Sequence, residues 1–67
     1  MIKTVIWWSN NAVMVCDEKG EQIPEYQGRY EDVKDKILKD SSPATEFSTG
    51  VWKKSLTVIS REEFAKE

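Results

Sequence analysis

Two adjacent tryptophans, Trp7 and Trp8, lie in the apolar run of residues 5–15, VIWWSNNAVMV. The β-branched and aromatic residues around them are typical of a β-strand. Neighbouring side chains of a strand point to opposite faces of its sheet, so only one of the two indoles can enter a given core. The other tryptophan needs a second cover, and what covers it becomes the main question about this chain.

Two turn signals predict how the first strands pair. Strand composition occurs in residues 2–8, 12–16 and, more briefly, 21–24. Asn10 and Asn11 suit a two-residue type I′ hairpin, because Asn tolerates the positive φ that this turn requires. Residues 17–20, DEKG, suit a type I turn that is closed by a left-handed glycine. The sequence therefore predicts a three-stranded antiparallel β-meander.

This register assigns the side chains of the meander to two faces. A two-residue loop pairs Trp8 with Val13 and Trp7 with Met14, and paired residues share a face. The more uniformly apolar face is predicted to be the core, with Ile2, Thr4, Ile6, Trp8, Val13, Val15 and Ile23. The second face would carry Lys3, Val5, Trp7, Met14, Cys16, Gln22 and Pro24. A register error of one residue would exchange the two sets, but one tryptophan would still be left over.

The middle of the chain changes from strand spacing to helical spacing. Four apolar residues recur at i, i+3, i+7 and i+8, namely Tyr30, Val33, Ile37 and Leu38. This spacing predicts a helix over residues 29–39 with one apolar face, which should pack on the core face of the sheet. Pro43 prevents the helix from continuing.

The last third of the chain predicts further strand and a short helix. Residues 46–59 alternate as a strand does, but the STG of 48–50 leaves one long strand and a short hairpin as alternatives. Ser60 and Glu63 then match a capping box, which predicts a C-terminal helix with Phe64 on its apolar side. The whole pattern predicts an α+β fold, with a small, mainly antiparallel sheet and one main helix packed on one face.

The composition fits a single small globular domain over residues 1–67 and disfavours several classes of protein. With 39% hydrophobic residues the chain is too apolar to be disordered. A single cysteine, Cys16, cannot form an internal disulfide, so a cytoplasmic location is expected. The N-terminal apolar run is too short for a signal peptide, and no stretch approaches a membrane span, so no membrane partner is expected.

Catalytic and metal chemistry have little support in the sequence. The chain has no His, which removes the commonest general base and the commonest neutral metal ligand. Cys16 has no partner for a nucleophilic or thiolate metal site and is best explained as a small packed hydrophobe. Glu31, Asp32 and Asp35 fit the solvated side of the predicted helix. We therefore expect neither an enzyme, nor a cofactor, nor a metal ion.

One candidate partner is a single-stranded nucleic acid. Trp52, Lys53 and Lys54, together with Arg29 and Trp7, combine aromatic surface with positive charge, as single-strand platforms do. A net charge of −2 at pH 7 and a pI near 5.1 count against this alternative. Lysines on a strand also commonly protect a sheet edge against aggregation. Nucleic acid therefore ranks second.

A protein partner is the favoured hypothesis. Val5, Trp7 and Met14 would form an apolar patch on the second face, and exposed Trp and Met are typical of interface cores. Either the helix that carries Phe64 or a second copy of the chain can cover this patch. The sequence therefore suggests a non-enzymatic protein-interaction module, which self-associates as a homodimer where the second copy provides the cover.

Overall fold

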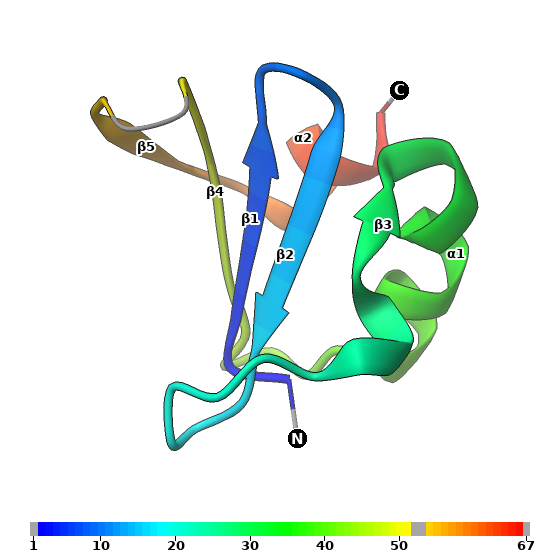
Figure 1. Ribbon diagram of the computed structural model, residues 1–67. Helices are drawn as coiled ribbons and strands as arrows, with labels where there is room; N and C mark the ends of the chain where they lie inside the picture. The colour runs from blue at the N-terminus through cyan, green and yellow to red at the C-terminus, as the bar shows by residue number, and fades with distance from the viewer. Residues whose placement is uncertain (1, 52–53, 67) are drawn as a thin grey trace.

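The structure of the chain, a computed structural model, describes residues 2–51 and 54–66. Within these residues, five strands form one sheet in the order β3-β2-β1-β4-β5 (Figure 1). In chain order the elements are β1 (Thr4–Trp8), β2 (Ala12–Cys16), the 3-10 helix η1 (Pro24–Tyr26), β3 (Gly28–Arg29), α1 (Tyr30–Asp40), β4 (Glu46–Gly50), β5 (Leu56–Ile59) and α2 (Arg61–Ala65). Neighbouring strands are antiparallel except β1 and β4, which run parallel. The predicted α+β class, a mostly antiparallel sheet with one main helix, is confirmed.

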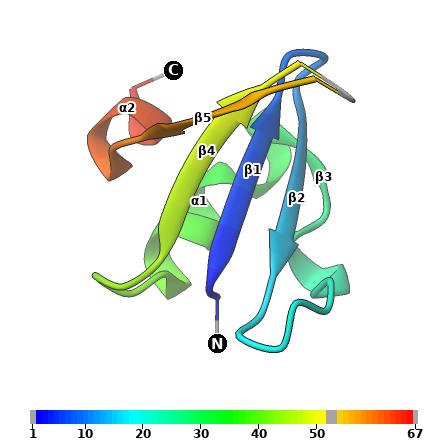
Figure 2. The ribbon, with the colours of Figure 1, turned by 90° about the vertical axis from the view of Figure 1, so that its left-hand side faces the viewer.

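The molecule has two layers, the sheet and α1 behind it, and α2 lies to one side of the strands (Figure 2). We call the sheet face toward α1 the inner face and the opposite one the outer face. The core lies between the inner face and the helices, and its buried residues are Ile2, Val5, Val13, Val15, Tyr30, Val33, Ile37, Phe47 and Phe64. In the part of the chain that the structure describes, no helix has the length and apolar character needed to cross a bilayer.

Several elements form where local signals predict them. The α1 stripe faces the core, with Tyr30, Val33 and Ile37 buried. The DEKG turn has its left-handed glycine, because Gly20 has φ 83° and its N–H donates to the Asp17 carbonyl at 3.0 Å. The capping box that begins α2 is also present, with both of its reciprocal hydrogen bonds.

The β1–β2 hairpin differs from the prediction by one residue. Its loop has three residues, 9–11, and only Asn11 has positive φ, at 70°. The longer loop pairs Trp7 with Val13, where the two-residue loop would have paired Trp8 with it. The predicted faces of β2 are therefore right and those of β1 are reversed, so that Trp7 and not Trp8 lies over the core.

The strand that was expected over residues 21–24 does not form. Gln22 makes an isolated bridge to Cys16, and Pro24 then begins η1. Proline suits the first turn of a helix because it has no N–H to donate. The strand that pairs with β2 is instead β3.

Residues 46–59 form a hairpin, which decides between the two alternatives that the alternation left open. Its strands, β4 and β5, pair antiparallel from Phe47–Ile59 to Gly50–Leu56. The parallel pairing of β4 with β1 was not predicted. It places β1 at the centre of the sheet, β4 beside it and β5 at one edge.

Candidate interaction surface

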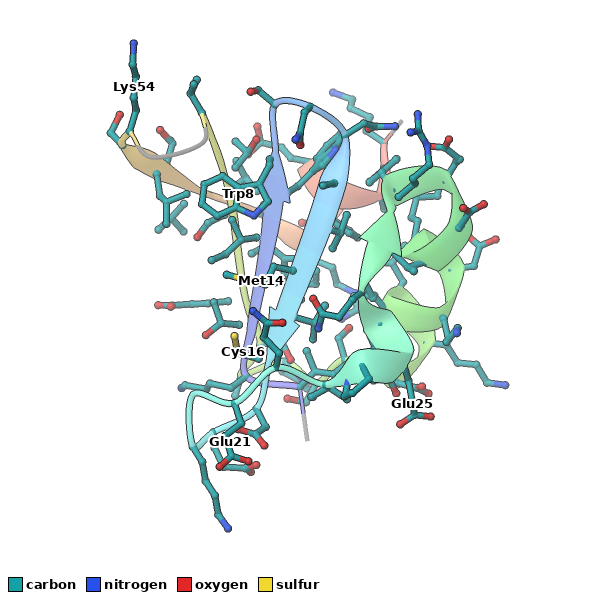
Figure 3. All side chains as sticks on the ribbon, in the orientation of Figure 1. Trp8, Met14, Cys16, Glu21, Glu25 and Lys54 are labelled. Atoms are coloured by element: carbon teal, nitrogen blue, oxygen red, sulfur yellow. The ribbon has the colours of Figure 1, made fainter. Side chains whose placement is uncertain are left out.

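The outer face is an apolar surface made by alternate residues of four strands. Because paired residues share a face, the register fixes its members. They are Thr4, Ile6 and Trp8 from β1, Ala12, Met14 and Cys16 from β2, Glu46, Ser48 and Gly50 from β4, and Leu56 and Val58 from β5. Trp8, Met14 and Cys16 are seen along the side of the sheet that points away from α1 (Figure 3).

Exposure on the outer face increases from the centre of the sheet to the β5 edge. Ile6 is only 9% exposed, because its neighbours on the face cover it, and Trp8 and Met14 are half-buried. Leu56 is 46% exposed and Val58 70%. Large apolar side chains at this level of exposure are uncommon when they gather on one surface of a monomer.

Neither helix covers the outer face. In Figure 2 the strands β4, β1 and β2 lie in front of α1, and α2 lies to one side of them. Phe64 of α2 is fully buried on the inner side, where its ring is 4.9 Å from that of Phe47 and 5.8 Å from that of Trp7. The helix that carries Phe64 therefore extends the core and leaves the outer face to another cover.

The structure separates the three residues predicted for the interface. Val5 is fully buried on the inner face, and Trp7 packs on the same face against Tyr30. Only Met14 lies on the outer face, where its sulfur accepts a hydrogen bond from Gln22 at 3.4 Å. The assignment of Val5 and Trp7 to the second face was wrong, for the reason that the loop has three residues and not two.

The residues predicted to contact nucleic acid are only partly among the described residues. Trp52 and Lys53 lie outside the described residues, whereas Lys54 is exposed at the tip of the β4–β5 hairpin (Figure 3). Trp7 is partly buried against the core, and the Arg29 guanidinium pairs with Glu31 at 3.0 Å. The described members of the set therefore do not form one platform.

Sequence reasoning did not place Trp8, Leu56 and Val58 on this surface. The alternation of Leu56 and Val58 with polar neighbours was visible in the sequence. The sequence did not indicate which face of the sheet they occupy, because no local signal predicts the pairing of β4 with β1. For Trp8, the missing information was the length of the hairpin loop that follows it.

Gly50 is the point at which β4 and β5 come closest on this face. A Cβ there would lie 2.5 Å from the Ser55 carbonyl oxygen and 2.8 Å from Leu56 Cδ2, which no real side chain tolerates. Gly50 also pairs with Trp8 on β1. The absence of a side chain at Gly50 therefore lets β5 approach β4 closely. It also lets Leu56 lie over Gly50, next to Trp8 of β1.

Charge is sparse on the outer face. Among its strand residues in the described part of the chain, Glu46 is the single charged side chain, and it lies at the end of β4 far from Lys54. The cores of protein interfaces are likewise depleted of charged residues. The surface thus has the composition of an interface core, with charges at its two ends.

Trp7 is held on the inner face by a ring contact and a hydrogen bond. Its ring stacks on Tyr30 with centroids 4.0 Å apart, and its Nε1–H donates to Asn11 Oδ1 at 3.1 Å. Asn11 Nδ2 donates to Glu31, which also accepts from Arg29. The backbone N–H of Glu31 and then these two side chains lower the pKa of its carboxyl. Trp7 is therefore held by a polar chain that leads to solvent.

A shallow groove of about 260 Å³ lies where β5 leaves the sheet. Its lining residues are Ser42, Pro43, Thr45, Glu46, Phe47, Val58, Ile59, Ser60 and Arg61. The Arg61 guanidinium donates to the Leu38 carbonyl and the Ser41 hydroxyl, so it caps the end of α1. The groove therefore lies between the start of β4 and the end of β5, and the carboxylate of Glu46 is among its lining groups.

Two other side chains with shifted pKa values, Tyr26 and Asp17, form hydrogen bonds within the fold. Tyr26 donates to Asp40 at 2.5 Å, and this hydrogen bond raises the pKa of Tyr26 to about 12. Hydrogen bonds from the backbone, chiefly from the N–H of Glu21, lower the pKa of Asp17 in the DEKG turn. In the same residues, no three Cys, Asp or Glu side chains gather as metal ligands do. These groups thus stabilise turns and helix ends.

No protein-family model matches the chain, and comparisons with the curated proteins and with the solved structures find no significant match. Function must therefore be inferred from the surface itself.

Proposed function

We propose that this chain is a non-enzymatic protein-interaction module that self-associates through its outer sheet face. The observation that carries the proposal is a set of half-buried to exposed apolar side chains on the outer face, over which neither helix packs: Trp8, Met14, Leu56 and Val58. A second copy is the partner that supplies a surface of the same low charge. If two outer faces packed against each other about a two-fold axis, each of these side chains would be buried in both copies.

The size of the face sets the strength that we expect. Strands of five residues at about 3.3 Å per residue, and four strands at about 4.8 Å, give a face of about 16 by 19 Å. This is roughly 300 Å² in plan, whereas stable complexes bury about 800 Å² on each partner. The face-to-face dimer should therefore be weak, with a dissociation constant in the upper micromolar range or above.

Single-stranded nucleic acid is less well supported as a partner. Two of the aromatic and basic residues considered for it, Trp7 and Arg29, are engaged within the chain. Lys54 remains as an exposed cation at the hairpin tip, in a chain with a net charge of −2. A platform needs several phosphate contacts to bind at physiological salt, so no measurable binding of single strands is expected there.

Sedimentation equilibrium from micromolar to millimolar concentration tests the proposal, with a reducing agent present so that Cys16 cannot cross-link copies. We expect reversible association, and Met14→Glu should abolish the part that uses the outer face by placing a charge in the middle of it. Lys39→Gln is the matched control, because it changes the net charge by the same amount on exposed α1. A monomer throughout the range, or equal effects of the two variants, would refute the proposal.

A further inference from the structure

The two edges of the sheet are built differently. β3 has two residues, of which Gly28 has φ 144° and Arg29 is charged. Beside it, the Gln27 side chain bonds both the N–H and the carbonyl of Val15, as a neighbouring strand would. Short length, charge and side-chain caps are how proteins block an edge against further strands. This edge is therefore closed.

The opposite edge, β5, has none of these devices. It has four residues, LTVI, without charge, glycine or proline, and it is hydrogen-bonded to β4 alone among the described strands. Thr57 and Val58 are exposed, Val58 by 70%. β-Branched residues with no charge favour the addition of another strand.

We propose that β5 pairs antiparallel with β5 of a second copy, around a two-fold axis at Thr57. The pairing joins two five-stranded sheets into one continuous sheet. It uses backbone groups at the edge and not the outer face, so it is a second interface that goes beyond the face-to-face association proposed above. A second copy is the occupant because the sequence of β5 is complementary to itself.

The register follows from the faces of the side chains. Paired residues share a face, so with Thr57 opposite Thr57 of the other copy, Leu56 lies opposite Val58. Thr–Thr and aliphatic cross-strand pairs are both favourable, and no like charges oppose one another in the strand. In this arrangement the two outer faces lie on the same side of the continuous sheet, which doubles the apolar surface.

The charges that flank β5 favour the antiparallel direction. Lys53 and Lys54 precede the strand in sequence, and Glu62 and Glu63 follow it. Arg61, which lies between them, is engaged at the end of α1. Antiparallel strands bring the basic end of one copy to the acidic end of the other, whereas parallel strands would bring like charges together.

The groove beside β5 lies at the acidic end. In the proposed register Lys54 of one copy is opposite Ser60 of the other, and Glu46, which lines the groove, is the next strand position across from Ser60. Within one chain Glu46 is distant from the hairpin tip that carries Lys54, because four strand positions, about 13 Å, separate it from Gly50, the β4 residue nearest the tip. The groove therefore offers a carboxylate to the lysine of the second copy.

The test places like charges on the two-fold axis. Thr57→Glu and Thr57→Lys each put two equal charges directly opposite one another, and each should weaken association about tenfold or more. An equimolar mixture of the two variants should restore association, because the opposed charges then attract. Thr57 is exposed in the single chain, so the fold should survive, which circular dichroism checks.

Sedimentation of the intact chain, of Met14→Glu and of Thr57→Glu separates the two proposals. If both hold, the intact chain forms a tetramer, each variant forms a dimer and the double variant is a monomer. If the face proposal alone fails, the intact chain is a dimer that Thr57→Glu disrupts and Met14→Glu does not.

The edge proposal is refuted if Thr57→Glu leaves the association of the intact chain unchanged, or if mixing the Glu and Lys variants restores nothing. An intact chain that remains monomeric at millimolar concentration refutes both proposals. Binding of an unrelated extended peptide to β5, with no self-pairing, would show that the edge is open but that its occupant is another protein, and would also overturn the inference.

Discussion

At the scale of single residues, Asn11 shows how one polar side chain can hold a tryptophan on the inner face of the sheet. A buried indole needs an acceptor for its N–H. Asn11 supplies one to Trp7 from the loop that its own positive φ makes possible. The backbone N–H of Tyr30 also donates to the Asn11 carbonyl, at 2.9 Å. Asn11 thus joins the hairpin loop to the start of α1 and holds the ring that stacks on Tyr30.

The first prediction compares the two tryptophans. Trp7→Ala should lower the free energy of unfolding by about 2–4 kcal/mol, because it removes a stacked, half-buried ring and leaves Asn11 without a donor. Trp8→Ala should cost clearly less at low concentration, since Trp8 lies on the outer face. Urea denaturation of both variants at micromolar concentration measures this. An equal loss in both variants would mean that the outer face is as well packed as the inner one.

At the scale of elements, α2 is too short to persist without tertiary contacts. Its five residues are held by the capping box at Ser60 and by Phe64, whose ring packs against Phe47 and Tyr30. The Tyr30 hydroxyl donates to the Phe64 carbonyl, which fixes the last turn to the start of α1. The C-terminal helix is therefore part of the core, although it is remote in sequence from most of it.

The second prediction concerns the removal of this helix. A chain ending at Ser60 should fail to fold, because it loses Phe64 and uncovers the rings of Phe47, Tyr30 and Trp7. Phe64→Ala should lower the free energy of unfolding by about 3–5 kcal/mol, and Ser60→Ala by about 1 kcal/mol through loss of the cap. Near-ultraviolet circular dichroism would report the loss of aromatic packing. A truncated chain with an intact near-ultraviolet spectrum would contradict the role given to α2.

Elements with local signals at their ends were predictable from the sequence, and pairings between distant segments were not. The α1 stripe, the DEKG turn and the capping box of α2 depend on residues within a few positions of one another. The parallel pairing of β4 with β1 joins segments about forty residues apart, for which spacing and turn chemistry carry no signal. One residue of loop length then reversed β1, so of the predicted surface only Met14 is on the outer face.

At the scale of the whole molecule, two layers cannot cover both faces of the sheet. Both helices are used on the inner side, and a domain of this size has no further layer to offer. The chain therefore combines a core with an apolar outer face and one open edge. The two proposals give both surfaces the same occupant, a second copy of the chain, and that assembly would remove from water what the single chain leaves exposed.

The last prediction is that the stability of the intact chain depends on its concentration. Association that involves only folded chains stabilises them, and for a weak dimer at about twice its dissociation constant the gain is about 0.5 kcal/mol per chain. For a domain of this length this is an increase in Tm of roughly 2–4 °C. Differential scanning calorimetry from micromolar to millimolar concentration measures it, and Lys39→Gln should keep the dependence. The variant that carries both Met14→Glu and Thr57→Glu should lose it, because neither the face nor the edge can then associate. If the intact chain and this double variant unfold at midpoints that are equally independent of concentration, the outer face and β5 do not mediate self-association.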